Sequence, residues 1–469
     1  MRMTLSDIAE ATGGCIVDAD PGTVVTGVST DTRTITGGDL FVALRGERFD
    51  GHDFVRPACE AGAAAVLVEC DSQFAGSPAH GDVIPRIAAP NTLAAYGDLA
   101  RAWRRRFSIP VIAITGSVGK TTTKNLTALA LNPLGPVLKT EQNENNEVGL
   151  PKTLLRLNDG HRAVVLEIGM RGAGQIAALA RIAEPTIGVV TVVGESHIEL
   201  LGSREGIACA KAELFESLGP DGVAILNIDD PFSALLRGHI HGRTVTVGES
   251  EAADYRLLDA RLTETGVSGD VATPGTAGNG QPNSMPGGEC VALRLASPAR
   301  HDLLNAVAAI AAAGAAGVSP RDAVDALAGY APSPMRMQRI PLSCGAIVIS
   351  DCYNAAPTSM RRALETLAAG ASEGRKIAIL GDMKELGGHA PAMHAEAVRY
   401  AASLGVTEIY TVGDEFRRQA PLARAQFDDS TGAADYAREH LRLSVGDVVL
   451  VKGSRAMEME RIVEALVDR

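Results

Sequence analysis

Four unbroken apolar segments in the middle of the chain constrain its fold more than any other feature. They cover residues 111–114, 163–168, 187–193 and 222–227, and valine, isoleucine and leucine dominate them. Strands that are buried on both faces have such continuous apolar runs, as in parallel sheets covered by helices. Turn and helix patterns separate the four segments. The sequence therefore predicts an α/β domain built on a parallel sheet.

A second set of strand signals lies toward the C-terminus. Residues 347–351, 376–382, 408–413 and 447–453 each place an apolar run before a glycine or an aspartate. Ligands of doubly wound sheets bind at the carboxyl ends of the strands. We therefore expect a C-terminal Rossmann-like domain with its binding residues at these strand ends.

The remaining parts of the chain have weaker patterns. Short apolar runs at 41–44 and 65–68 alternate with alanine-rich stretches, which predicts a small α/β domain. Residues 266–289 are rich in glycine, proline, threonine and asparagine, so we expect a mobile surface loop there. The 469 residues are too many for one compact core. We expect three α/β domains: a small N-terminal domain at 1–88, a central parallel-sheet domain at 89–331 and a C-terminal Rossmann-like domain at 332–469.

Charge and cysteine content exclude several classes of function. The formal charge of −12 argues against general binding of nucleic acid or of anionic membranes. A basic group at Arg101 and residues 104–106 ends a predicted helix at 92–107, and we expect it to be solvated. The seven cysteines show no CxxC spacing, and no apolar segment has the length of a membrane span or a secretory signal. We expect a cytoplasmic protein with reduced thiols and no membrane insertion.

A glycine-rich segment that ends in Lys-Thr-Thr follows the first apolar run. The pattern Gly-x-x-Gly-Lys-Thr between a strand and a helix is typical of loops that bind phosphates with backbone N–H groups, a lysine and a Mg²⁺-binding hydroxyl. Ile114 occupies a position where the full phosphate-loop pattern has glycine, so the match is to a shorter form. The alternative is an ordinary glycine-rich turn. We expect ATP to bind at Thr115, Gly116, Ser117, Val118, Gly119, Lys120, Thr121 and Thr122.

Three further polar residues are ambiguous when each is considered alone. Glu167 ends a predicted strand, where a carboxylate can hold Mg²⁺ but is equally common as a solvated strand end. His197 follows another predicted strand, and Lys211 lies on a predicted helix. Taken singly, a loop histidine and a solvated lysine are the simpler interpretations.

Several segments together resemble the Mur ligases, the ATP-dependent amide-bond-forming enzymes of peptidoglycan precursor synthesis. In the central part of the chain the similar segments are 115–122, 145–149, 166–172, 197–203 and 210–213. The resemblance extends over nearly the whole chain, through residues 29–33, 40–46 and 50–54 near the N-terminus and residues 351–357, 380–387 and 451–455 near the C-terminus.

The C-terminal segments are similar to the member of the family that adds D-alanyl-D-alanine to UDP-N-acetylmuramoyl-tripeptide. The Asp-Asn-Pro-Arg string of the ligase that adds the third residue is absent. The resemblance implies ATP-driven ligation through an acyl phosphate, with the nucleotide-sugar tripeptide and the dipeptide as the other substrates. We expect a monomer.

The resemblance gives the ambiguous residues a joint role. It implies two Mg²⁺ ions, one held by Thr121 and Glu167, and a second held by His197 and by Lys211 carbamylated with CO₂. A carbamate is a hard anionic ligand for Mg²⁺, whereas an ammonium would repel the ion. Lys120, Glu167, His197 and Lys211 are therefore the implied catalytic residues.

The resemblance also implies binding residues outside the phosphate loop. Asn305 matches an adenine-contacting asparagine, although a polar residue at a helix start is an equally good interpretation from the sequence alone. Arg336 and Asp351 match C-terminal groups that reach ATP. The implied substrate-binding residues are Ser29, Thr30, Asp31, Arg33, Arg45, Asn145, Asn146, Tyr353, Asn354, Lys452 and Ser454.

Four positions depart from the usual residues of the family, namely Val118, Val192, Cys352 and Ala356, where asparagine or serine is common. None is an expected metal or phosphate ligand. Two other enzyme readings remain open, the third-residue ligase and a folylpolyglutamate synthetase, which usually lacks the first domain. From a different class, a nucleotide-dependent switch or transport protein also carries a phosphate loop.

Overall fold

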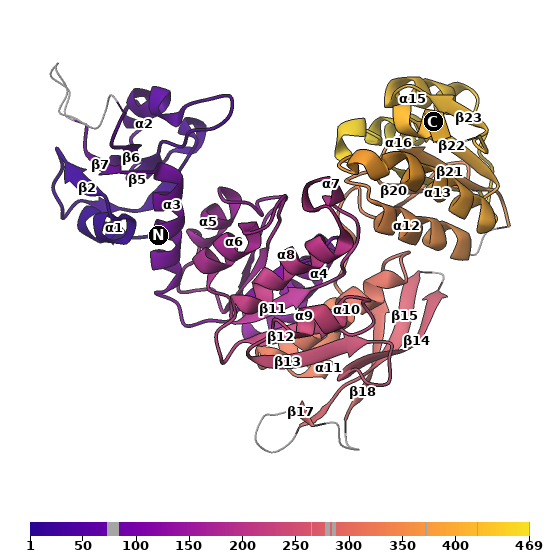
Figure 1. Cartoon of the computed structure of the whole chain (residues 1–469), viewed down its shortest axis with the longest axis horizontal. Coiled ribbons are helices and arrows are strands. Elements are labelled where there is room, and N and C mark those ends of the chain that lie inside the picture. Colours follow the sequence, from indigo (N-terminus) through magenta and orange to yellow (C-terminus); the bar gives the residue numbers. More distant parts are fainter. Residues whose placement is uncertain are drawn as a thin grey trace. The chain divides into compact units, whose positions relative to one another are not determined.

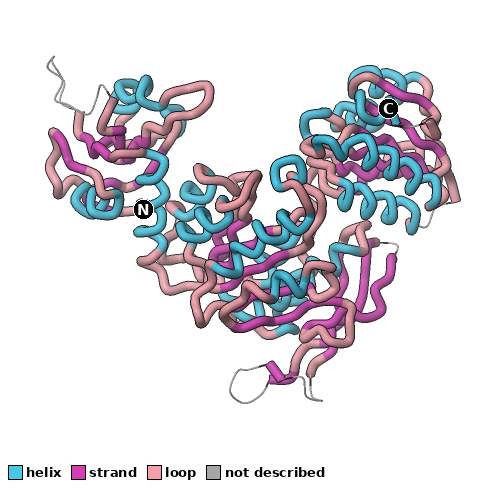
Figure 2. Tube along the Cα trace, in the orientation of Figure 1, coloured by secondary structure: helices cyan, strands magenta, loops and turns pink. Residues whose placement is uncertain are grey.

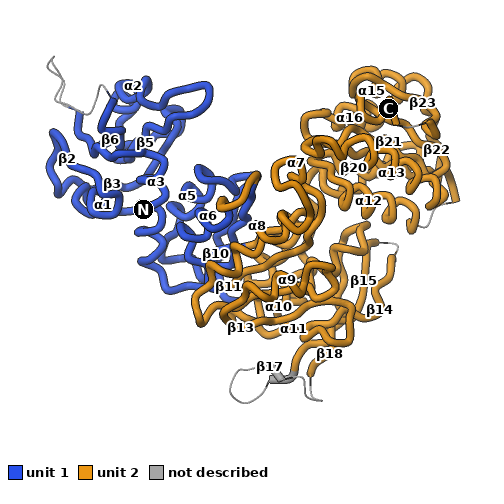
Figure 3. The backbone as a smooth tube through the Cα atoms, viewed as in Figure 1, with its two compact units in different colours: residues 1–113, 134–170, 176–186 blue, residues 114–133, 171–175, 187–469 orange. Residues whose placement is uncertain are grey.

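The computed structural model describes residues 1–72, 84–263, 265–276, 282–283, 288–370, 373–419 and 421–468. Figure 1 shows the helices and strands along the chain, and Figure 3 shows the two compact units into which the chain divides. Unit 1 consists of residues 1–113, 134–170 and 176–186, and unit 2 consists of residues 114–133, 171–175 and 187–469. No helix within the described ranges has the length and apolar character needed to cross a bilayer.

Unit 1 begins with a small α/β sheet. The strand order is β2-β7-β6-β5-β4, in which β2 is antiparallel to β7 and the other neighbours are parallel. Apolar side chains such as Phe41, Val55 and Val66 form its core. The elements are β1 Met3–Thr4, α1 Leu5–Thr12, β2 Cys15–Val17, β3 Val24–Val25, β4 Gly27–Ser29, β5 Asp39–Val42, α2 Val55–Glu60, β6 Ala65–Glu69 and β7 Arg86–Ala89.

The helix predicted at 92–107 is α3, Thr92–Arg104, and Asn91 caps its N-terminus through a hydrogen bond to the Ala94 N–H. From the sequence we expected its basic end to be only solvated, and the structure shows ion pairs there as well. Arg101 and Arg105 form ion pairs with Glu184, because the chain returns to this helix end 80 residues later. The rest of unit 1 holds β9 Val137–Lys139, α5 Gly149–Leu154, β10 Ala163–Glu167 and most of α6 Gln175–Ala183, with β9 and β10 parallel.

Unit 2 contains a run of strands in the order β11-β12-β13-β14-β15-β18. The first four are parallel, and β15 and β18 extend the sheet in antiparallel fashion. The elements of this part are α4 Lys120–Ala130, β11 Ile187–Val190, α7 Ile198–Leu201, α8 Arg204–Glu216, β12 Val223–Asn227, α9 Ser233–Arg237, β13 Arg243–Gly248, β14 Tyr255–Thr263, β15 Gly266–Ala272, β16 Gly275–Thr276, β17 Pro282–Asn283, β18 Cys290–Leu295, α10 His301–Ala315 and α11 Pro320–Leu327. Strand β8, Val111–Thr115, crosses the division between the units.

The expected loop at 266–289 is wrong for its first part. Residues Gly266–Ala272 form β15, which pairs with β14 on one side and β18 on the other. The glycine content led to the wrong prediction, because glycine has a weak propensity for strands. Ladder hydrogen bonds on both edges, together with burial of Val267 and Val271, stabilise the strand despite that propensity. Residues 277–281 and 284–287 lie outside the described part of the chain.

The last part of unit 2 is the predicted second doubly wound sheet. Its strand order is β19-β20-β24-β21-β22-β23, and only the edge strand β19 is antiparallel to its neighbour. Helices surround these strands (Figure 2). The elements are β19 Gln338–Pro341, β20 Ile347–Asp351, α12 Pro357–Ala369, β21 Lys376–Gly381, the 3₁₀ turn η4 Gly387–His389, α13 Ala390–Ser403, β22 Glu408–Val412, α14 Asp414–Gln419, β23 Ala425–Phe427, α15 Ser430–Glu439, β24 Val448–Lys452, the 3₁₀ turn η5 Arg455–Met457 and α16 Glu460–Val467. Three further 3₁₀ turns lie earlier in the chain, η1 Thr32–Thr34, η2 Gly51–Phe54 and η3 Asn132–Leu134.

Candidate active site

The predicted phosphate loop joins β8 to α4 and is held against the segment after β11. Gly116 has a φ of 151°, and a Cβ at this position would lie 1.9 Å from Thr191 Oγ1, so only glycine fits. The backbone N–H of Ser117 donates to Val192 O at 2.7 Å. The Thr191 hydroxyl donates to Val118 O at 2.6 Å. Backbone contacts thus fix the loop conformation.

The end of the loop forms the first turn of α4. Gly119 is the N-cap with a φ of 88°, so this helix start carries no capping side chain. Lys120 Nζ donates to Gly116 O at 2.7 Å, which places an ammonium over the loop. Thr121 is buried and Thr122 is partly buried in the same turn. A helix N-terminus with an adjacent lysine is a suitable environment for a phosphate.

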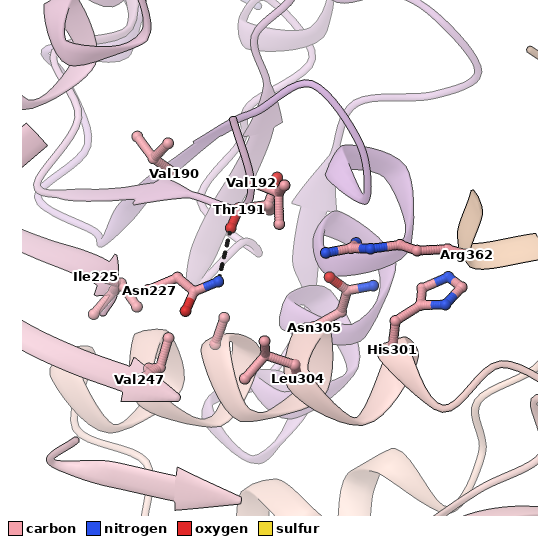
Figure 4. Close-up of a pocket in the computed structure, with 11 residues that line it drawn as sticks. Val190, Thr191, Val192, Ile225, Asn227, Val247, His301, Leu304, Asn305 and Arg362 are labelled. Atoms are coloured by element: carbon pink, nitrogen blue, oxygen red, sulfur yellow. Dashed lines mark hydrogen bonds between the residues drawn. The ribbon is translucent and has the colours of Figure 1, made fainter. Parts of the chain in front are cut away.

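A pocket lies beside the phosphate loop at the carboxyl ends of β11 and β12 (Figure 4). Val190 and Ile225 give it apolar walls, and Thr191 and Asn227 add polar groups, with Asn227 Nδ2 3.4 Å from Thr191 O. Helix α10 contributes Asn305, one of the predicted nucleotide-binding residues. The open space of this pocket is small, about 10 Å³, but its lining of apolar walls and a few polar groups beside the predicted phosphate loop has the composition of a nucleoside site.

Asp302 fixes the orientation of Asn305 in this pocket. The amide nitrogen of Asn305 donates to Asp302 Oδ1 at 3.1 Å, and the Ser297 hydroxyl donates to Asp302 Oδ2 at 2.5 Å. The amide oxygen of Asn305 faces Gly119, where an added Cβ would lie 2.8 Å from it. Burial raises the pKa of Asp302 to about 6, against the opposing effect of its hydrogen bonds. Asp302 thus positions Asn305 between the pocket and the phosphate loop.

Lys211 is buried on α8, with an exposed fraction of 1%. Burial is the largest cause that lowers its pKa well below the ordinary value, and the charge of Lys120 lowers it further. No carboxylate in the described residues forms an ion pair with its amine. The environment therefore favours the neutral amine over the ammonium.

His197 and Glu385 form a contact between α7 and the third predicted domain. His197 Nδ1 lies 2.7 Å from Glu385 Oε2. Both residues have left-handed backbone conformations, with φ of 66° and 64°, which are uncommon for residues other than glycine. Hydrogen bonding from His197 is the main cause that lowers the pKa of Glu385. Within the described residues, no group of three His, Cys, Asp or Glu side chains is arranged as a metal site.

Glu167, Asn145 and Asn146 belong to unit 1. Asn145 Nδ2 donates to Glu167 Oε1 at 2.9 Å, so the structure brings these two predicted site residues together. Asn146 Oδ1 accepts from the Gly149 N–H at 2.9 Å at the start of α5. Asn146 therefore has a structural role in holding this turn.

Six predicted residues lie together at the carboxyl ends of β20 and β24. Asp351 and Lys452 are register partners on these parallel strands, and Lys452 Nζ donates to Asp351 Oδ2 at 2.5 Å and to Asn354 O at 2.9 Å. The guanidinium of Arg336 lies 3.9 Å from the ring centroid of Tyr353, a cation–π contact. Ser454 follows β24, where its Oγ accepts from the Lys384 N–H at 2.9 Å.

The predicted residues of the N-terminal domain form two smaller groups. Arg33 pairs with Asp31 at 2.6 Å, and hydrogen bonds from Arg33 lower the pKa of Asp31 to about 2. Ser29 Oγ donates to Asp31 O at 2.8 Å, and Thr30 lies between them in the chain. Arg45 lies elsewhere on this domain and forms an ion pair with Glu69 at 3.0 Å.

The four positions that depart from the family pattern have backbone or packing roles. Val118 presents its carbonyl to Thr191, and Val192 lines the pocket. Cys352 is buried, with its thiol 3.4 Å from Val451 O, and burial raises its pKa to about 12. Ala356 is the N-cap of α12 and offers no side-chain acceptor.

Sequence reasoning missed three residues of this region. Asp302 is three residues before Asn305, a spacing that puts both on one helix face, and this signal was available. Arg362 lines the pocket from α12, and Glu195 contacts the start of that helix. Neither residue lies in a motif, so the sequence held no signal for them.

The chain matches three family models in succession. Residues 24–104 match the Mur ligase family catalytic domain, residues 114–313 match the Mur ligase middle domain and residues 335–455 match the Mur ligase glutamate ligase domain. The UDP-N-acetylmuramoyl-tripeptide--D-alanyl-D-alanine ligase of Bacillus subtilis (strain 168) is 36% identical over 475 residues, which cover 100% of this chain and 99% of the relative. The chain belongs to the Mur ligase family.

Solved structures of the family agree with this placement. A crystal structure of MurF from Acinetobacter baumannii is 30% identical with a TM-score of 0.88, and it covers 100% of this chain and 99% of that one. The MurF ligase of Thermotoga maritima in complex with ADP is 28% identical with a TM-score of 0.82, and it covers 95% of this chain and 97% of that one. The α/β architecture expected from the sequence is therefore confirmed.

Proposed function

We propose that this Mur ligase joins D-alanyl-D-alanine to UDP-N-acetylmuramoyl-tripeptide and converts ATP to ADP and phosphate. The product would be the UDP-N-acetylmuramoyl-pentapeptide precursor of peptidoglycan. The observation that carries the proposal is 36% identity over the whole chain with a ligase named for that reaction. The cluster of polar residues at the ends of β20 and β24 supports it, because the dipeptide would bind there.

The reaction would proceed through an acyl phosphate. A carboxylate oxygen of the tripeptide attacks the γ-phosphorus of ATP, and ADP leaves. The amine of the dipeptide then attacks the acyl carbon, loses a proton and expels phosphate. All reacting groups in the first step are anionic, so charge compensation and alignment are the main requirements. Lys120 and the N-terminus of α4 would provide both at the phosphates.

The remaining site residues take binding roles in this proposal. Asn305 would contact the adenine from α10, and Arg336 and Asp351 would contact ATP from the third domain. Tyr353, Asn354, Lys452 and Ser454 would recognise the dipeptide. The nucleotide-sugar tripeptide would contact Ser29, Thr30, Asp31, Arg33, Arg45, Asn145 and Asn146.

Two Mg²⁺ ions are part of the proposal. Thr121 and Glu167 would hold one, and His197 and carbamylated Lys211 would hold the other. The burial of Lys211 fits this role, because CO₂ adds to a neutral amine to form an N–C bond with loss of a proton. When bound, the ions supply positive charge that stabilises phosphoryl transfer.

A panel of acceptors tests the function. Purified protein is supplied with ATP, Mg²⁺ and UDP-N-acetylmuramoyl-tripeptide, and phosphate release is measured with D-alanyl-D-alanine, L-alanyl-L-alanine, lysine, diaminopimelate or glutamate. We expect release only with D-alanyl-D-alanine. A site that hydrogen-bonds one amide and one carboxylate rejects analogues that leave its polar groups unpaired.

The same panel, extended to a UDP-sugar dipeptide and a folate as acceptors, separates the other candidate functions. Fastest release with a single amino acid on a UDP-sugar dipeptide would assign the chain to the third-residue ligases instead. Glutamate addition to a folate would identify a folylpolyglutamate synthetase. Turnover of ATP that does not depend on any amine would point to a nucleotide-dependent switch. The expected monomer is checked by light scattering on the same sample.

A further inference from the structure

Helix α12 lacks a cap of its own. Its N-cap residue is Ala356, which has no side-chain oxygen to accept from the N–H groups of the first turn. Ser359 provides only half of a capping box, since its Oγ accepts from the Ala356 N–H at 3.0 Å. Serine, threonine, aspartate and asparagine are the preferred N-cap residues, because their side-chain oxygens accept from these N–H groups. The start of α12 therefore needs an acceptor from elsewhere.

Glu195 supplies that acceptor from the segment after β11. Its Oε2 accepts from the Thr358 N–H at 3.1 Å and from the Thr358 hydroxyl at 2.5 Å. A carboxylate at a helix N-terminus is also favoured by the helix dipole. Gly194 allows the approach, because a Cβ there would lie 2.7 Å from Thr358 Oγ1. The segment after β11, which borders the pocket, thus caps a helix of the third predicted domain.

Arg362 lies one helical turn after Thr358, on the same face of α12. Its side chain enters the pocket beside Asn305 and His301 (Figure 4). The guanidinium forms no ion pair or hydrogen bond with another described residue, although it is half-buried. The nearby carboxylate of Asp302 is already engaged by Ser297 and Asn305.

A guanidinium in this position has donors for a ligand and a planar face for a base. The pocket beside the phosphate loop is where the nucleoside of ATP would bind under the proposed function. We propose that Arg362 binds the nucleotide from the third domain, and that Glu195 and Thr358 are positioning residues that hold Arg362 over the pocket. This inference rests on the proposed use of ATP, and it adds Arg362 to the proposed nucleotide-binding residues.

Equilibrium binding of ADP to the full-length protein provides the test. We expect Arg362→Ala to weaken ADP binding about tenfold, which corresponds to about 1.4 kcal/mol. Arg362→Lys should recover only part of the affinity, because lysine keeps the charge but loses the planar fork. Arg361→Ala is the matched control. The guanidinium of Arg361 is exposed and stacks on Tyr400, so ADP affinity of this variant should match that of the wild type.

The positioning role is tested by Glu195→Gln and its combination with Arg362→Ala. Glu195→Gln should weaken ADP binding a few-fold on its own and have no further effect when Arg362 is already alanine. Melting temperatures of all variants are measured in parallel, to separate lost affinity from lost folding.

Three results would overturn the inference. These are a wild-type affinity in a folded Arg362→Ala protein, equal losses for Arg361→Ala and Arg362→Ala, or additive effects of Glu195→Gln and Arg362→Ala. A wild-type protein that binds ADP and ligates while Arg362→Ala is unaffected would overturn this inference and leave the proposed function standing. A wild-type protein that binds no nucleotide would overturn both.

Discussion

His197 Nδ1 and Glu385 Oε2 lie 2.7 Å apart, and both residues hold left-handed backbone conformations. Such conformations cost on the order of 1 kcal/mol or more for residues with a Cβ, and they concentrate at functional sites. Because both ends of one contact carry this strain, we infer that the contact has a functional role. It joins the α7 segment to the loop after β21 in the third predicted domain.

The first prediction concerns the Glu385 side of this contact. Glu385→Gly relieves the backbone strain and removes the carboxylate, so we expect a protein that melts no lower than wild type but ligates more slowly. Glu458→Gly is the control, because Glu458 has a φ of 48° and is exposed at the C-cap of η5. Steady-state ligation rates and melting temperatures give the result. Unchanged ligation by Glu385→Gly would assign the contact to stability alone.

The second prediction concerns the ammonium over the phosphate loop. Lys120→Ala should lower ligation by roughly a thousandfold, the range seen when a charge-stabilising group is removed from an active site. The fold should persist, since Lys120 is only partly buried and donates to a backbone carbonyl. Circular dichroism and turnover are measured on the same preparation. Near-normal turnover in a folded variant would remove the loop lysine from the mechanism.

The third prediction concerns the ion pair of the C-terminal sheet between the buried Lys452 and the partly buried Asp351. Asp351→Ala leaves the ammonium of Lys452 buried without a carboxylate, and we expect a loss of about 3 kcal/mol in unfolding free energy. Lys452→Met should cost less alone and should offset much of the loss in the double variant. Urea unfolding of the four proteins gives the coupling energy. Additive losses would show that the two side chains stabilise the fold independently.

The fourth prediction concerns the carbamate proposed at Lys211. Lys211→Ala should lose most activity, and acetate should restore part of it by placing a carboxylate in the vacated space. Methylammonium is the matched additive, because it restores the positive charge instead, and it should give no recovery. A crystal structure of the wild type with Mg²⁺ provides the direct check. A bare lysine directed away from the ion would contradict the assignment.

The fifth prediction follows from the raised pKa of Asp302. The folded value is about 6 and the ordinary value is 3.8, so the folded protein binds a proton more readily between these two values. This group's contribution to stability is therefore full below about pH 3.8 and is lost as the pH rises through about 6. Asp302→Asn should flatten the pH dependence of the unfolding free energy between pH 4 and pH 7. An unchanged slope would show that the carboxyl titrates normally.

The sequence was sufficient to predict the elements whose signals are local. The runs at 163–168 and 447–453 became β10 and β24 because their apolar side chains are buried on both faces of a sheet. The turn between β8 and α4 at residues 115–122 was also predictable, because its glycines, lysine and threonines are adjacent in the chain. Asp351 and Lys452 were predicted as separate site residues. Their ion pair was not predicted, because it depends on the pairing register of β20 and β24, which only the structure gives.

What the sequence did not predict depends on residues distant in the chain. Glu195 caps a helix that begins 162 residues later, and no local pattern marks either partner. In the sequence, Arg362 cannot be distinguished from a solvated arginine on a helix. Only the fold places it in a pocket. The strand β15 was missed because its pairing partners, rather than its own propensity, stabilise it.

Trp103 is the only tryptophan of the chain, and its indole N–H donates to Leu157 O at 3.0 Å within unit 1. The ring is buried, and Phe107 packs edge-on against it. Selectively excited indole emission therefore reports on unit 1 alone, whereas far-ultraviolet dichroism averages over every helix and strand. Following both signals through one thermal scan would distinguish the melting of unit 1 from that of the whole chain, with no label attached.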